Sequence, residues 1–261
     1  MSIRSHLLDV AAGRRKIRVF EMGEGRPLVF LHSAGGLAED NPFLAALARH
    51  WHVFAPLLPG YGDSEGAESL ATCSTSPCIR STFWTRWGST GRSWSAIRWA
   101  AFAAEMAAIA PREVERLGLI APAGLWLDAH PIPDLFSKLP HELPGLLFHN
   151  PEFGERVMTA GADFDDPKFL EAFIIRNTRQ LAMAGKMLFP IPDRGLDERL
   201  YRIRAKTVLI WGESDRVIPA AYGNAFCRGI AGAELVQIPA AGHMVIVEQP
   251  EAVVAALASL E

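Results

Sequence analysis

Short, uninterrupted apolar runs recur along this chain, and each is followed by a loop of small or polar residues. Residues 28–31 and 207–211 contain almost no polar side chain, which is typical of strands buried on both faces of a parallel sheet. Helical segments separate the runs, so crossover connections must join consecutive strands. The pattern predicts an α/β fold with a mostly parallel central sheet flanked by helices.

Caps and turn residues also bound the other expected strands and helices. Asn41 followed by Pro42 is a helix cap and first-turn pair. Strands are expected at residues 6–10, 16–22, 28–32, 52–56, 114–121, 207–211 and 234–238. Helices are expected at residues 42–49, 102–109, 220–230 and 251–260.

Residues 127–198 differ from the rest of the chain. They are rich in proline, phenylalanine and helix formers, and they carry no strand pattern. We expect them to form an inserted helical lid over a single core made of residues 1–126 and 199–261. A chain of 261 residues suits one large domain with such an insertion.

Charge and cysteine content narrow the class of partner. The formal charge is −3 and the basic residues are scattered, which predicts no binding to nucleic acid or to an anionic membrane. Residues 1–13 lack the apolar run of a secretion signal, and Glu105 interrupts the longest apolar stretch. Three cysteines without metal-ligand spacing fit a reducing cytoplasm. We expect a cytoplasmic protein with a small-molecule substrate, and its oligomeric state stays open.

Three loops at the carboxyl ends of expected strands carry the candidate chemistry. Small residues at 32–36 let backbone N–H groups point into a pocket, where they can stabilise an oxyanion. Taken singly, this loop could be a tight turn, Asp215 an acidic turn residue, and His243 a solvated histidine. Asp215 and His243 follow neighbouring strands, however, and such a pair lets a carboxylate orient an imidazole as general base.

Through these motifs the chain resembles the α/β-hydrolase family over about residues 15–68 and 102–261. The matching segments are residues 32–36 at the oxyanion loop, 59–64 after the fourth strand, 212–215 at the acid and 242–243 at the base. The resemblance implies that Asp215 is the acid, that His243 is the base and that the Ala34 N–H is an oxyanion donor. The family's oxyanion loop usually begins His-Gly, and Ser33 departs from that pattern.

The resemblance also implies a nucleophile on a strained Gly-Xaa-Ser-Xaa-Gly turn, ahead of the acid and the base in the chain. The sequence contains no such motif. Its expected place, before the helix at 102–109, is occupied by Arg98, which cannot act as a nucleophile. Trp99, the next residue, would supply the second oxyanion N–H.

The segment around this place has an unusual composition. Between Glu68 and Glu105 there is no acidic residue, while four of the seven tryptophans fall inside. In the neighbouring reading frame the codons force Leu at the slot of Trp84 and Gly at the slot of Ala100. With allowed codons, residues 95–101 become Val-Gly-His-Ser-Met-Gly-Gly, which is the family's strand and elbow with serine at the slot of Arg98. We therefore predict a frameshifted stretch at about residues 71–101.

Several readings of the chain compete. An intact enzyme could use Ser93 or Ser95 as nucleophile, although the second glycine of the turn is missing there. A non-catalytic small-molecule or protein binding module could share the scaffold. Relatives with an aspartate nucleophile are disfavoured, because no arginine codon at position 98 gives aspartate in the other frame. The favoured reading is a serine hydrolase with a damaged segment, which predicts a destabilised and inactive chain that has lost a helix and a central strand.

The expected activity is hydrolysis of an ester, a related acyl bond or a carbon–carbon bond by a Ser-His-Asp mechanism. No metal or organic cofactor is implied, because no ligand cluster or phosphate-binding glycine loop is present in the sequence. An apolar substrate is expected from aromatic and aliphatic residues in and beside the lid, although any one of them could belong to the lid's own core. These residues are Trp126, Phe136, Leu147, Phe148, Phe153, Phe164, Phe169 and Phe173.

Overall fold

A computed structural model of the chain describes residues 2–10, 13–69, 93–97, 100–188 and 195–261. Its centre is an eight-stranded sheet in the order β1-β2-β4-β3-β5-β6-β7-β8. β2 runs antiparallel to β1 and β4, whereas all the pairs from β4 to β8 are parallel. The predicted α/β fold with a mostly parallel central sheet is confirmed.

The strands lie close to the runs that the sequence marks. The bounds are β1 (Arg4–Val10), β2 (Arg15–Met22), β3 (Pro27–Leu31), β4 (His52–Pro56), β5 (Ser93–Ile97), β6 (Arg116–Ile120), β7 (Lys206–Gly212) and β8 (Glu234–Ile238). In β7 every residue after Lys206 is buried, and in β3 every residue after Pro27 is buried. Unbroken apolar runs therefore become central strands here, as burial on both faces requires.

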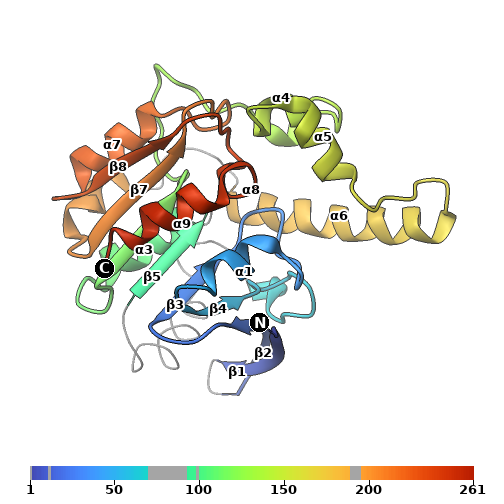
Figure 1. Cartoon of the computed structure of the whole chain (residues 1–261), viewed down its shortest axis with the longest axis horizontal. Coiled ribbons are helices and arrows are strands. Elements are labelled where there is room, and N and C mark those ends of the chain that lie inside the picture. Colours follow the sequence, from blue (N-terminus) through green and yellow to red (C-terminus); the bar gives the residue numbers. More distant parts are fainter. Residues whose placement is uncertain (1, 11–12, 70–92, 98–99, 189–194) are drawn as a thin grey trace.

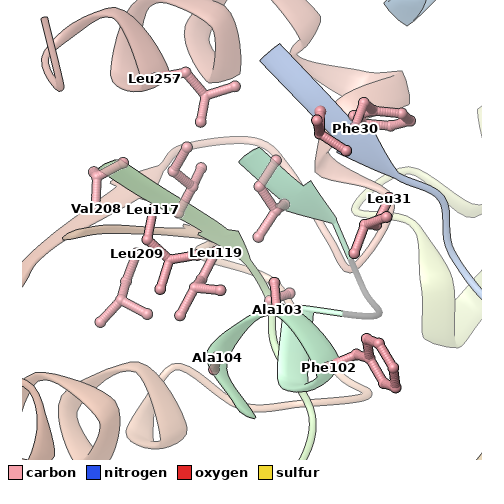
Figure 2. Packing of buried hydrophobic residues seen from close by; sticks show 14 of the residues in the cluster. Phe30, Leu31, Phe102, Ala103, Ala104, Leu117, Leu119, Val208, Leu209 and Leu257 are labelled. Carbon is pink, nitrogen blue, oxygen red and sulfur yellow. The ribbon is translucent and has the colours of Figure 1, made fainter. Parts of the chain in front are cut away.

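Helices cover the two faces of this sheet. α1 (Pro42–Leu47) begins after Asn41, whose Oδ1 accepts a hydrogen bond from the Phe43 N–H at 2.9 Å, so the predicted cap is present. α3 (Ala100–Ile109) and α7 (Ala221–Gly229) both contact the 3₁₀ helix η4 (Asp197–Arg202). α9 (Pro250–Ala258) follows the short α8 (Val245–Glu248) and contacts α1. Figure 2 shows Leu257 of α9 on one side of the strands and Phe102 of α3 on the other.

The connection between β6 and β7 forms a second, largely helical layer. It contains η3 (Leu135–Ser137), α4 (Leu143–Leu147), α5 (Pro151–Thr159) and the long α6 (Pro167–Leu188), and no strand occurs in its described residues. In Figure 1 these helices stand to one side of the sheet, and α6 reaches far beyond it. Phe164, Phe169 and Phe173 pack on one another, with ring centroids 5.3 to 6.1 Å apart.

One structural expectation for the unusual segment is wrong. The altered stretch was expected to lack the central strand, yet β5 pairs in parallel register with both β3 and β6. Backbone hydrogen bonds from two buried neighbours place a strand there, and the β-branched and aromatic residues of Ser93–Ile97 are compatible with it. The predicted elbow position falls between β5 and α3, and most of residues 71–101 lie outside the described residues.

None of the helices in the described ranges has the length and apolar character needed to cross a membrane. The longest, α6, carries charged side chains along its course and turns isoleucines such as Ile174 and Ile175 toward solvent.

Candidate active site

The acid candidate lies on the loop that leaves β7. Asp215 is 8% exposed, and its Oδ1 accepts hydrogen bonds from the backbone N–H groups of Val217 at 2.9 Å and Ile218 at 2.8 Å. Two backbone donors fix the orientation of the carboxylate. The second oxygen, Oδ2, contacts His243.

The base candidate lies on the loop that leaves β8. His243 is 7% exposed, and its Nδ1 lies 2.7 Å from Asp215 Oδ2. An ionised carboxylate can only accept, so Nδ1 carries the proton and the tautomer leaves Nε2 with its lone pair. The structure thus brings together the two side chains that the sequence pairs, in the orientation that general base chemistry requires.

Backbone contacts also join the two loops that carry this pair. The Glu213 N–H donates to the Ile238 carbonyl at 3.0 Å, and the Ser214 N–H donates to the Ala241 carbonyl at 2.9 Å. At Gly212, an added Cβ would lie 2.2 Å from the Gly242 carbonyl oxygen. This close approach requires glycine at the end of β7.

His32, just beyond β3, is a structural anchor rather than an acid or base. Its Nε2 accepts from the Leu58 N–H at 2.9 Å, so Nδ1 carries the proton and donates to the Ser33 carbonyl at 2.7 Å. Burial lowers the pKa of His32 to about 4, against the raising effect of the Ser33 contact. The imidazole is therefore neutral at pH 7 and holds the start of the oxyanion loop.

Ala34 lies at the centre of this loop. Its carbonyl accepts a hydrogen bond from the Tyr61 hydroxyl at 3.0 Å, and the Tyr61 ring packs edge-on against His32 with centroids 4.6 Å apart. Within the described residues the Ala34 N–H donates no hydrogen bond. A backbone N–H on a fixed loop that no described group accepts from is the kind of donor that can stabilise an oxyanion.

The remaining two site predictions cannot be placed. Arg98 and Trp99, expected at the nucleophile slot and as the second oxyanion donor, lie outside the described residues. β5 ends at Ile97 and α3 begins at Ala100.

α6 contacts two of the loops around the candidate site. A Cβ on Gly36 would lie 3.0 Å from Nε2 of Gln180, and a Cβ on Gly60 would lie 2.6 Å from the sulfur of Met183. The middle of α6 therefore lies directly against the loops that follow β3 and β4. No group of three or more His, Cys, Asp or Glu side chains in the described part of the chain is arranged to hold a metal ion.

Sequence reasoning missed two contributors to this geometry. His32 appeared only as the first residue of a small-residue loop, and its position directly after a buried strand is the available signal. Glu248 appeared only as part of the segment after His243, yet its Oε2 accepts from the Gly242 N–H at 2.7 Å. The available signal for Glu248 is its position, because it is a carboxylate that follows the candidate base by a few residues and stands just before a helix.

The sequence model of the alpha/beta hydrolase family matches residues 28–256. The chain belongs to the alpha/beta hydrolase family. The loops after β7 and β8, which carry Asp215 and His243, therefore belong to an α/β-hydrolase core.

Individual relatives of this α/β-hydrolase are distant. Lipase 1 of Psychrobacter immobilis is 23% identical over 251 residues, covering 86% of this chain and 73% of the lipase. The dihydrolipoyllysine-residue acetyltransferase component of the acetoin cleaving system of Pseudomonas putida is 30% identical over 266 residues. That match covers 92% of this chain, which spans only 65% of the Pseudomonas protein.

Solved structures share the fold over nearly the whole chain. The 2-hydroxy-6-oxo-6-phenylhexa-2,4-dienoate hydrolase of a Rhodococcus species has a TM-score of 0.72 at 19% identity, covering 99% of both chains. A bacterial membrane phospholipase A has a TM-score of 0.76 at 21% identity, covering 99% of this chain and 85% of that one. Hydrolases are thus among the relatives of this α/β-hydrolase in both sequence and fold.

Proposed function

We propose that this chain descends from a serine-type hydrolase of small-molecule esters, related acyl compounds or carbon–carbon bonds, and that its nucleophile is absent as written. The observation that carries the proposal is the buried contact of 2.7 Å between His243 Nδ1 and Asp215 Oδ2. A buried imidazole whose Nδ1 is held against a carboxylate has the orientation that a general base requires.

In the undamaged enzyme, a serine at the slot of Arg98 attacks the substrate carbonyl carbon. His243 takes the serine proton and later gives it to the leaving group, while Asp215 holds the imidazolium. The N–H groups of Ala34 and of residue 99, Trp99 in this chain, stabilise the tetrahedral oxyanion. Water, deprotonated by His243, then releases the acyl group and regenerates the serine.

The damaged segment explains why the nucleophile is missing. In the neighbouring frame the slots of residues 95–101 can encode strand and elbow, with serine replacing Arg98. As written, the chain can offer oxyanion donors and a base but no attacking oxygen, so we expect it to be less stable and inactive.

For the substrate, we propose a small apolar molecule admitted under a lid formed by residues 127–198. The proximity of Gln180 to Gly36 and of Met183 to Gly60 supports this, because both side chains belong to α6. Apolar side chains on α4 to α6 would then face the acyl or ring portion of the substrate. We propose no metal, organic cofactor, nucleic acid or membrane partner. We propose that the protein is cytoplasmic.

The first experiment is to resequence the coding DNA from codon 65 to codon 105 and translate all frames. A compensating pair of insertions or deletions around a Gly-His-Ser-Met-Gly-Gly reading supports the proposal. The restored chain should then hydrolyse 4-nitrophenyl esters of short and medium acyl length, and His243→Ala in that chain should abolish the activity. Hydrolysis by the chain as written that disappears with His243→Ala would overturn the inactive-chain proposal.

A second candidate is a non-catalytic binding module on the same scaffold. It is favoured by one observation, namely that β5 is paired on both sides although its sequence lacks the elbow. If the DNA confirms the present frame, the chain as written should fold cooperatively and bind small apolar ligands without turning them over. Cooperative unfolding in denaturant and calorimetric titration with such ligands distinguish the two candidates.

A further inference from the structure

The carboxylate of Glu248 joins two segments that are far apart in the chain. Its Oε2 accepts the Gly242 N–H at 2.7 Å, and its Oε1 accepts the His149 N–H at 2.8 Å and the Asn150 N–H at 3.3 Å. Gly242 directly precedes the base candidate, whereas Asn150 caps α5. One side chain therefore holds the base loop against the junction of α4 and α5.

The base loop and this junction also touch through the backbone. The Met244 N–H donates to the Leu147 carbonyl at 2.9 Å. An added Cβ on Gly242 would lie 2.8 Å from the His149 nitrogen and from the Leu147 oxygen. The two segments are thus in van der Waals contact around His243, and Gly242 allows the approach.

The acid loop contacts the same junction from its other side. His149 Nδ1 lies 2.8 Å from Ser214 Oγ, and Arg216 Nη1 donates to the carbonyls of Gly145 at 2.7 Å and Phe148 at 3.2 Å. Ser214 and Arg216 flank Asp215 in sequence. Residues 145–150 are therefore hydrogen-bonded to both neighbours of the acid and to Met244, which follows the base, and Glu248 links them to Gly242, which precedes it.

We propose that Glu248 is a positioning residue that sets the orientation of the His243 imidazole by bonding the Gly242 N–H to the start of α5. The Gly242 N–H is buried and requires an acceptor, and a charged acceptor bonds it more strongly than a neutral one. Without that carboxylate, the Gly242 N–H loses its hydrogen-bond acceptor. The peptide before His243 can then shift, and Nδ1 no longer points at Asp215 Oδ2. The position of the α4–α5 junction is then coupled to the acid–base pair.

This inference rests on the geometry of the pair and not on turnover, so it stands or falls separately from the proposed hydrolase activity. The test uses the full chain as written, labelled uniformly with ¹⁵N and compared with Glu248→Gln by nuclear magnetic resonance. The matched control is Glu213→Gln, which removes an equal charge near Asp215. The Glu213 side chain is exposed and forms no hydrogen bond or ion pair within the described residues.

In Glu248→Gln we expect the downfield His243 Nδ1 proton resonance to broaden or disappear, while Glu213→Gln retains it. We also expect amide exchange at Gly242 and His149 to accelerate about tenfold or more, with the exchange of β7 amides unchanged, because the opening is local. A local loss of both signals is the result that a positioning role requires.

Two outcomes would overturn the proposal. One is an Nδ1 resonance and exchange rates in Glu248→Gln that match the unsubstituted chain. The other is faster exchange throughout β7 and α9, which would show that Glu248 stabilises the whole fold and not the imidazole. If Glu248→Gln does not fold, Glu248→Asp keeps the charge but is one methylene shorter, and it should show the same local changes in weaker form. An unchanged Glu248→Asp would equally overturn the proposal.

Discussion

Gly212 and Gly242 meet so closely that a Cβ on the first would lie 2.2 Å from the carbonyl oxygen of the second. This contact joins the ends of the loops that carry Asp215 and His243. Because both partners are backbone, neither can turn aside as a flexible side chain would. The acid–base pair therefore depends on a backbone fit as well as on the hydrogen bond between its side chains.

Gly212→Ala should destabilise the fold and separate the two loops. Since the obstructing atom belongs to the backbone, we expect a loss of about 3 kcal/mol in the free energy of unfolding. Denaturant unfolding measures this loss. Gly145→Ala is the matched control, because its added Cβ meets nothing within 4 Å and should change stability by at most about 1 kcal/mol. Equal effects of the two substitutions would refute the role of the close approach.

Asp215→Asn should disable catalysis in the restored chain with little change in its fold. The amide oxygen can still accept from Val217 and Ile218, whereas the amide nitrogen would face His243 Nδ1 and impose the wrong tautomer. We expect kcat/KM for ester hydrolysis to fall by about four orders of magnitude. Glu213→Gln serves again as the control, and it should retain activity within a few-fold. Retention of activity by Asp215→Asn would exclude Asp215 as the orienting acid.

Stability should fall with acid because of His32. Its pKa is lowered to about 4 in the folded protein, against roughly 6.5 in the unfolded chain, so the unfolded state binds more protons between these values. The contribution of His32 is thus fully present above pH 6.5 and is lost as the pH falls toward 4. The 2.5-unit difference corresponds to about 3 kcal/mol.

His32→Asn provides the comparison for that prediction. The unfolding free energy of the unsubstituted chain should decrease between pH 6.5 and 4 by about 3 kcal/mol more than that of His32→Asn. His141 is exposed, so His141→Gln should follow the unsubstituted chain throughout. Parallel curves for the unsubstituted chain and His32→Asn would show that His32 is not held neutral by burial.

Tyr61→Phe should loosen the oxyanion loop. It removes the hydroxyl that donates to the Ala34 carbonyl while keeping the ring against His32. The half-buried carbonyl then lacks its donor, so we expect about 1 kcal/mol of destabilisation. In the restored chain kcat should fall more than KM rises, because the oxyanion donor acts in the transition state. Tyr201→Phe, at a residue 75% exposed, should change neither quantity, and a similar loss there would contradict the assignment.

Local pattern was enough to predict most of the sheet and the meeting of Asp215 with His243. Buried parallel strands have a recognisable apolar run, and loops that leave neighbouring strands of such a sheet share an edge. Asn41 was predictable as a cap for the same reason, since its partner Phe43 lies two residues away.

The rest could not be predicted, because it depends on partners that only folding brings together. His32 is anchored by the Leu58 N–H, and Glu248 by the N–H groups of Gly242 and His149. Backbone partners of this kind leave no trace in side-chain spacing. β5 was missed because its own residues signal a strand weakly, while its neighbours β3 and β6 provide the hydrogen bonds that form it.

β5 lies between two groups of strands that come from different parts of the chain. β1 to β4, from the first 56 residues, lie on one flank, and β6 to β8, from residues 116–238, lie on the other. Ala34 belongs to the first half-sheet, whereas Asp215 and His243 belong to the second. β5 is thus the spacer that sets how far the oxyanion donor stands from the base. The proposed reading-frame lesion would fall in this strand, between the half-sheet that carries Ala34 and the half-sheet that carries Asp215 and His243. A small error in its register would shift these two groups of residues relative to each other.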